Sequence, residues 1–182
     1  MAEPLPHVDA PDSPAGKATA HADLERRVAL LDLAGQLTVA QIMQHDLVSI
    51  DVEATLREAQ SALAQHGIHH LLVYNHGHLV GVLSDRDVLL HLSPFLGTLS
   101  EQARDLRTLH RRVYQIATYH PTTIRPDTPV LQAAALLLDH GFSSLPVIDA
   151  AGTVVGMVTT RDLLRGIVEC VLPVCPPSAE AA

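Results

Sequence analysis

Apolar residues gather in short runs along this chain, and the runs come in pairs separated by turn residues. The turns read Asn75-His-Gly in the first half and Asp149-Ala-Ala-Gly in the second. Short apolar runs bounded by such turns are typical of buried strands. We therefore predict one antiparallel strand pair in each half. The predicted strands are Leu71–Tyr74, Leu79–Leu83, Leu145–Ile148 and Thr153–Val158.

A helix is predicted before each strand pair, with its own start and stop residues. Thr55 and Glu58 have the spacing of a capping box, and Gly67 follows the last helical position. In the second half the helix begins at Thr128-Pro129 and ends at Gly141. A further helix is expected after each GVL or GMV strand, so each half alternates strands with helices.

Shorter elements and end segments complete the predicted layout. Thr38 can cap a short helix, and Ile50 and Ile124 belong to short extended stretches. Residues 22–33 have the apolar spacing of an amphipathic helix, whereas neither end of the chain shows a period. The predicted segments are a disordered start (1–21), a helix and linker (22–37), a first unit (38–92), a connection with a polar helix (93–112), a second unit (113–171) and a flexible tail (172–182).

The two halves are copies of each other. A displacement of 74 residues superimposes several stretches, and the last needs one residue more. The pairs are VAQIM (39–43) with VYQIA (113–117), AQHGIHHLLV (64–73) with LDHGFSSLPV (138–147), and LVGVLSDRDVL (79–89) with VVGMVTTRDLL (154–164). One copy would leave a sheet face exposed, and two copies packed back to back would cover it.

Composition narrows the class of protein. The 182 residues are 47% hydrophobic but only 3% aromatic, which predicts a globular core of aliphatic side chains. A net charge of −8 opposes binding to nucleic acid. Neither a membrane-spanning apolar run nor a signal peptide is apparent, so we predict a cytoplasmic protein without membrane contact. Cys170 and Cys175 match no metal or redox motif and are expected to be free thiols.

The order of these elements resembles a known family. A short helix, a strand, a helix ending in HG, the HHLLV or SSLPV strand, GVLSDRD or GMVTTRD and a last helix resemble the cystathionine-β-synthase (CBS) domain. Two copies over about residues 35–171 resemble the tandem arrangement called a Bateman module. The resemblance implies an α+β fold of two pseudo-symmetric βαββα units packed through their sheets, and a homodimer. It also implies an adenosine ligand such as AMP, ADP, ATP or S-adenosylmethionine between the units.

The motif Ser84-x-x-Asp87, repeated as Thr159-x-x-Asp162, opens the last helix of each copy. This spacing is that of a capping box, in which hydroxyl and carboxylate bond each other's backbone amides. A carboxylate there can also accept hydrogen bonds from a ribose diol. The resemblance implies that each Asp binds ribose and that each hydroxyl contacts ribose or phosphate. A cap and a ligand contact are compatible in one motif.

A basic residue lies inside each motif, Arg86 in the first copy and Arg161 in the second. A positive charge is mildly unfavourable at a helix N-terminus, which favours an anionic partner such as phosphate. A salt bridge between Arg86 and Asp85 is the alternative explanation.

Histidines crowd residues 66–78. Imidazoles bind zinc, nickel or copper, but His69 and His70 are adjacent on a strand and should point to opposite faces, so we predict no metal site. By resemblance, both lie near the phosphates at the Asp87 site, whereas the second copy has Ser143-Ser144. The Asp87 site should therefore carry more positive charge below pH 6.5, which favours a polyphosphate there.

The resemblance also implies an apolar adenine slot at each site, contributed by the opposite copy. For the Asp87 site the slot residues are Ala117, Thr122, Thr123 and Phe142. For the Asp162 site they are Met43, Val48, Ser49 and Ile68. Taken alone, these residues also fit ordinary core packing.

The predicted function is regulatory. No catalytic Ser-His-Asp order, P-loop or HExxH motif is present, so we expect neither an enzyme nor a required cofactor. We expect a module that binds an adenine nucleotide and signals to a regulated protein, through segment 100–112 or the N-terminal helix. The alternatives are a ligand-free interaction scaffold, whose motifs act only as caps, and a histidine-based metal sensor.

Overall fold

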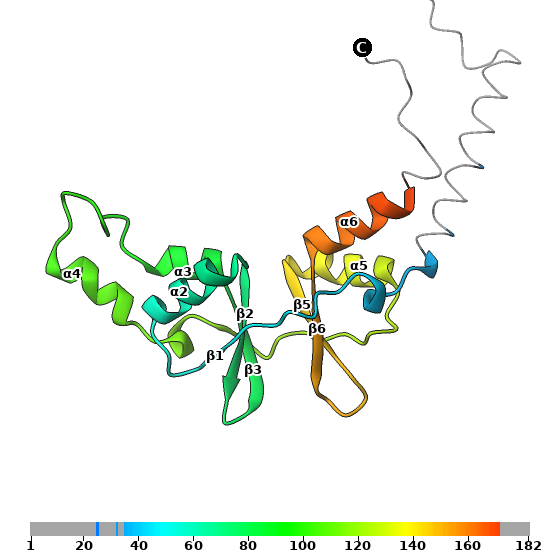
Figure 1. Ribbon diagram of the computed structural model, residues 1–182, viewed down its shortest axis with the longest axis horizontal. Helices are drawn as coiled ribbons and strands as arrows, with labels where there is room; N and C mark the ends of the chain where they lie inside the picture. Colours follow the sequence, from blue (N-terminus) through cyan, green and yellow to red (C-terminus); the bar gives the residue numbers. More distant parts are fainter. Residues whose placement is uncertain (1–24, 26–31, 33–34, 172–182) are drawn as a thin grey trace, which may run out of the picture.

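Each half of the chain places its strands beneath a layer of helices, and the two halves lie side by side (Figure 1). The computed structural model describes residues 25, 32 and 35–171. The predicted helix at 22–33, apart from residues 25 and 32, and the segments 1–21 and 172–182 lie outside the described residues.

The first unit contains a short 3₁₀ helix, three strands and two helices. They are η1 (Val39–Gln41), β1 (Ser49–Asp51), α2 (Leu56–His66), β2 (His70–Asn75), β3 (His78–Ser84) and α3 (Asp85–His91). The second unit has a similar order. Its elements are η3 (Val113–Gln115), β4 (Thr118–Tyr119), α5 (Val130–His140), β5 (Ser144–Ile148), β6 (Val154–Thr159) and α6 (Thr160–Val171). However, its first strand, β4, aligns with residues 44–45 of the first copy, and a single bridge at Ile124 takes the place of β1. The predicted α+β fold of two repeated units is confirmed.

The helix ends follow the local signals in the sequence. The Thr55 hydroxyl accepts a hydrogen bond from the Glu58 amide, and the Glu58 carboxylate accepts one from the Thr55 amide at 2.7 Å. Gly67 ends α2 in the left-handed conformation, at φ 61°. In the second unit, Gly141 ends α5 in the same way, and Pro129 occupies the capping position.

Each sheet is completed by the other copy. The first sheet has the order β1-β2-β3-β4, and β4 comes from the start of the second copy. Conversely, Gln44 from the first copy forms a bridge with Met157 in β6 of the second unit. The two copies therefore exchange the short segment at their start, which contains the 3₁₀ helix, η1 or η3, and the residues directly after it.

The cores show the same exchange. Val39, in η1 of the first copy, is fully buried in a cluster with Val130 and Val158 of the second unit. Val113, in η3 of the second copy, is fully buried with Val73 of the first unit. Each hydrophobic core therefore contains one valine that the other copy supplies.

Both faces of the strand pair in the first unit are covered. Leu71 and Val73 point toward the helices and belong to the first core, whereas Leu72, between them, points to the opposite face. Leu72 is nevertheless only 1% exposed. This burial is what packing of the two units through their sheets requires.

The connection between the units differs from the single polar helix that we expected. It contains a four-residue helix, α4 (Ala103–Leu106), followed by a 3₁₀ turn, η2 (Arg107–His110). Arg111 and Arg112 lie beyond both elements and donate hydrogen bonds to backbone carbonyls of the first unit. Asp105 is buried and accepts hydrogen bonds from the Ser93 hydroxyl and from the Gln102 amide, which caps the start of α4.

The exchange predicts where a core mutation acts. Val39→Ala removes two methyl groups from the second core, at a cost of about 2 kcal/mol in the free energy of unfolding. Native-state hydrogen exchange should show lost protection first in β5 and β6. The matched variant Val113→Ala should instead affect β2 and β3. Loss of protection in the unit that is nearer in sequence would contradict the exchange.

Candidate functional site

Both Ser/Thr-x-x-Asp motifs form the predicted capping boxes. The amide and hydroxyl of Ser84 donate to Oδ2 of Asp87 at 2.9 and 2.6 Å, and the Asp87 amide donates to the Ser84 hydroxyl at 3.1 Å. Thr159 and Asp162 repeat these contacts at 2.9, 2.6 and 3.3 Å. In each copy the cap uses Oδ2, so any difference between the two carboxylates depends on Oδ1.

Asp87 opens onto a cavity of about 460 Å³ between the two units. The first unit contributes Ser84, Arg86 and Asp87 from the capped turn, His70 from β2 and Val82 from β3. Residues from the second copy form the remaining wall. They are Thr118, Tyr119, His120, Pro121, Thr122, Gly141, Phe142, Ser143 and Ser144. Among the described residues, none donates a hydrogen bond to Oδ1 of Asp87.

Three residues expected at the Asp87 cavity do not line it. Ala117 packs against the first core, and Thr123 also lies outside the wall. His69, which directly precedes β2, lines the other cavity instead. Thr122, Phe142 and His70 do line the Asp87 cavity as expected.

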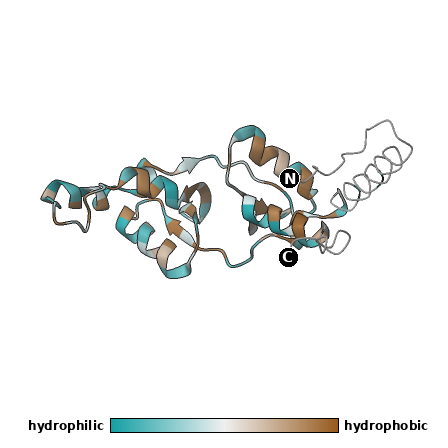
Figure 2. Cartoon of the chain, turned by 90° about the horizontal axis from the view of Figure 1, so that it is seen from above, coloured by the Kyte–Doolittle hydropathy of each residue, from teal (hydrophilic) through white to brown (hydrophobic). Residues whose placement is uncertain are grey.

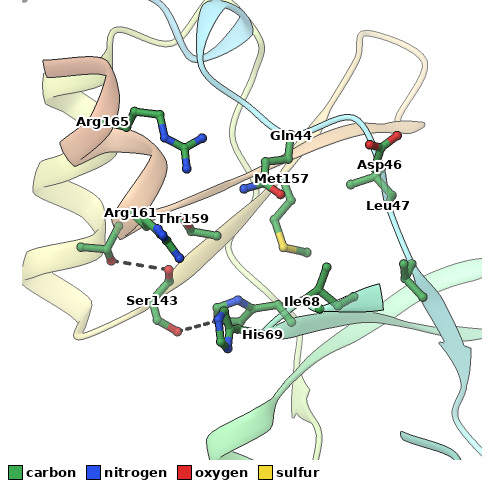
Figure 3. Close-up of a pocket in the computed structure, with 14 residues that line it drawn as sticks. Gln44, Asp46, Leu47, Ile68, His69, Ser143, Met157, Thr159, Arg161 and Arg165 are labelled. Atoms are coloured by element: carbon green, nitrogen blue, oxygen red, sulfur yellow. Dashed lines mark hydrogen bonds between the residues drawn. The ribbon is translucent and has the colours of Figure 1, made fainter. Parts of the chain in front are cut away.

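A second cavity, of about 320 Å³, lies beside the Thr159 turn (Figure 3). The expected residues Val48, Ile68, Ser143, Thr159 and Arg161 line it. It also has lining residues that the sequence did not predict for this site. They are Gln44, Asp46, Leu47, Gly67, His69, His70, Met157, Thr160 and Arg165.

Asp162 does not reach this cavity. It is only 2% exposed, and its Oδ1 accepts a hydrogen bond from Nε2 of Gln44 at 2.8 Å. Three other expected residues are also absent from the wall: Met43 packs against the second core, Ser49 lies in β1, and Ser144 lines the Asp87 cavity. The two cavities therefore differ in their capping carboxylate: Asp87 lines its cavity, whereas Asp162 does not line the other one.

A contact between His70 and Ser143 connects the two units between the cavities. Nε2 of His70 lies 2.8 Å from the Ser143 hydroxyl of the other unit, and both residues line both cavities. Burial lowers the pKa of His70, although the nearby carboxylates of Asp85 and Asp87 oppose that shift. The expected gain of positive charge at the Asp87 cavity therefore depends on His70 alone, because His69 does not line this cavity, and the lowered pKa of His70 moves that gain to lower pH.

The salt bridge between Arg86 and Asp85, which was the alternative explanation for the arginine, is not formed. Nδ1 of His69 lies 2.7 Å from Oδ2 of Asp85. Partial burial opposes ionisation of Asp85, but hydrogen bonds from His69 and the Arg86 amide outweigh it and lower the pKa of Asp85. No carboxylate of the described residues pairs with the Arg86 or Arg161 guanidinium. Both arginines are therefore available to an anionic ligand.

Two residues that the sequence prediction missed, Gln44 and Arg165, carry a signal in the repeat. Aligned copies place Thr118 opposite Gln44 and Leu90 opposite Arg165. Arg165 also follows Arg161 by four residues, so both lie on one face of α6. At both positions the two copies differ close to a shared motif, and this difference is the signal in the sequence that marks Gln44 and Arg165.

Two further features concern metal ions and membranes. Within residues 25, 32 and 35–171, no three His, Cys, Asp or Glu side chains are grouped to hold a metal ion. Cys170 is a free thiol, and Cys175 lies outside the described residues. No helix in the described part of the chain combines the length and apolarity needed to cross a bilayer.

The sequence pattern of the CBS domain matches residues 39–94 and 113–169, which is most of the chain and both copies. The chain belongs to the CBS domain family. It is 37% identical over 145 residues to a CBS domain-containing protein of Dictyostelium discoideum, covering 79% of this chain and 99% of that protein. It also spans 24% of a homoserine O-acetyltransferase of Methanohalobium evestigatum, at 30% identity over 132 residues. CBS pairs therefore occur in much longer proteins as well.

Solved CBS pairs have the same fold. CBSX2 of Arabidopsis thaliana in complex with AMP is 29% identical, with a TM-score of 0.58 over 72% of this chain and 96% of that one. The CBS pair of protein MJ0100, in complex with 5′-methylthioadenosine and S-adenosylmethionine, is 26% identical, with a TM-score of 0.59 over 73% and 97%. Relatives of this CBS protein thus bind adenosine-type ligands.

The buried His70 predicts a pH dependence of stability. Because its pKa is lower in the folded chain, the unfolded chain binds the proton more tightly, and stability should fall as pH decreases below about 6.5. His70→Gln should flatten this slope in denaturant unfolding measured from pH 7 to about pH 5. An NMR titration that gives His70 a pKa at or above the ordinary value would contradict the prediction.

Proposed function

We propose that this CBS pair is a cytoplasmic regulatory module that binds an adenosine-type ligand in the cavity beside Asp87. The observation that carries the proposal is the open Oδ1 of Asp87 at a cavity shared by both units. A volume of about 460 Å³ lies within the range of small-molecule sites. No reaction and no cofactor form part of the proposal.

The ribose contact follows from the hydrogen bonds already in use. Oδ2 of Asp87 accepts two hydrogen bonds from Ser84 and is thereby fixed in place. Oδ1 has two lone pairs and no donor among the described residues, so it can accept the hydroxyls of a ribose diol. The cap thus orients the carboxylate that would hold the sugar, because both roles use different oxygens of one side chain.

The two ends of the ligand would contact different chemistry. Phe142, Pro121 and Val82 offer apolar surface for a purine ring. Phe142 is held in place by stacking on His140, with ring centroids 5.2 Å apart. Arg86, which has no carboxylate partner among the described residues, would neutralise a phosphate or another anionic group.

The relatives support the adenosine moiety as the recognised part. The two solved relatives are complexes with AMP and with 5′-methylthioadenosine and S-adenosylmethionine. These compounds have adenosine in common and differ in their 5′ groups. A ligand held by both units would favour the arrangement that it fits best. A regulated protein that contacts the two arrangements differently would then receive the signal.

The Asp87 site makes a residue-specific prediction. AMP, ADP, ATP or S-adenosylmethionine at about 100-fold its Kd should stabilise the folded protein by about 2.7 kcal/mol. Asp87→Ala should abolish the thermal shift. Asp85→Ala is the matched control, because Asp85 lies on the same turn but outside the cavity and should leave the shift unchanged. A wild-type protein unmoved by all four compounds at millimolar concentration would favour the ligand-free scaffold.

We further propose that two copies associate through the helices. Large apolar side chains are exposed on α3, α5 and α6, which lie on the same side of the strands (Figure 1). Figure 2, viewed from that side, shows apolar residues along these helices. The exposed residues are Leu89, Leu90, Leu131, Leu138, Leu164 and Val168. Burial of such a surface is the usual basis of a stable dimer.

The proposed dimer can be tested by light scattering after size-exclusion chromatography. The expected mass is twice the chain mass of 19.5 kDa. Leu138→Glu should shift the protein toward the monomer, because Leu138 is 80% exposed on α5. Leu99→Glu places the same charge at an exposed leucine of the connection and should leave the mass unchanged. Equal effects of both variants would argue against the helical interface.

A further inference from the structure

We propose that Gln44 restricts this chain to one adenosine site, by occupying the carboxylate that the second site would need. The inference rests on the proposed function, since it takes the Asp87 contact as the ribose-binding mode. It explains why a duplicated motif gives two cavities with different chemistry.

Both carboxylate oxygens of Asp162 accept hydrogen bonds from within the protein. Oδ2 accepts from the amide and hydroxyl of Thr159 at 2.9 and 2.6 Å, as in the other copy. Oδ1 accepts from Nε2 of Gln44 at 2.8 Å. Asp162 is buried, whereas Gln44 is exposed. Gln44 lines the cavity (Figure 3). A ribose hydroxyl would have to displace the Gln44 amide to reach Asp162.

The backbone holds Gln44 in this position. Its amide donates to the Met157 carbonyl at 2.8 Å, and the Met157 amide donates to the Gln44 carbonyl at 3.0 Å. This bridge fixes the start of the Gln44 side chain at the edge of the second sheet. The glutamine is then long enough to reach Asp162 without further adjustment, as the 2.8 Å contact shows.

The other copy provides an internal comparison. Thr118 occupies the position of Gln44 in the aligned repeat and pairs with Val82, just as Gln44 pairs with Met157. The threonine side chain is shorter than that of glutamine and has no amide group. It donates no hydrogen bond to Asp87. Thr118 lines the Asp87 cavity and leaves Oδ1 open. The residue beside each carboxylate, Gln44 or Thr118, is thus one of the differences between the two sites and the one that contacts the carboxylate in only one copy.

The experiment is a calorimetric titration with the tightest binder among AMP, ADP, ATP and S-adenosylmethionine. Wild-type protein should bind one molecule per chain, at a site lost in Asp87→Ala. Gln44→Thr, which copies the residue of the other half, should add a second site that is lost again in Asp162→Ala. The affinity at that site should rise at least about tenfold, the usual effect of a hydrogen bond to a charged group.

The reciprocal variant tests the same mechanism at the other site. Thr118→Gln should weaken wild-type binding, and the double variant Gln44→Thr with Thr118→Gln should move the single site from Asp87 to Asp162. Melting temperatures in the absence of ligand show that each variant is folded.

The outcomes separate the inference from the proposed function. Two sites in the wild-type protein, one of them dependent on Asp162, would overturn the inference and leave the proposed function standing. A Gln44→Thr variant that is folded and still binds one molecule would overturn it as well. A wild-type protein that binds none of the four compounds would instead overturn the proposed function.

Discussion

The exchange of one short segment between the two copies is the constraint on which the rest of this structure depends. A strand pair with its helices lacks both an edge strand and a core valine, and the other copy supplies them. Val39 fills the second core and Val113 fills the first. Hydrophobic burial of this kind is worth a few kcal/mol for each side chain. The units are therefore held in a fixed relation by their own cores, in addition to any contact between their sheets.

The same exchange places the residues that shape the cavities. Gln44 follows the exchanged helix of the first copy and lies beside Asp162, and Thr118 follows the exchanged helix of the second copy and lines the Asp87 cavity. Each cavity is thus formed by a capped turn of one unit and an exchanged segment that enters from the other copy. A ligand between them would contact both copies. This arrangement suits a regulatory module, because a ligand can influence how the two units are held together.

The capping motif forms a helix cap in both copies and carries the proposed ribose contact in one of them. Ser84 and Asp87 form the same three hydrogen bonds as Thr159 and Asp162. The cap alone cannot distinguish a scaffold from a sensor, since it uses only one carboxylate oxygen. The second oxygen is open in one copy and occupied in the other. The two copies therefore differ at a neighbour of the motif and not in the motif itself.

The sequence by itself determined the duplication, the strands, the helix ends at Gly67 and Gly141, and the family, because these depend on local spacing and on comparison of the chain with itself. It also located the two turns that line or adjoin the cavities. Only the tertiary structure decided which copy completes each core, that His69 faces the cavity opposite to the one expected, and that Gln44 occupies Asp162. These facts join residues far apart in sequence, such as Gln44 and Asp162, and no local pattern encodes such a contact. It arises only when β6 pairs with the segment that the first copy contributes.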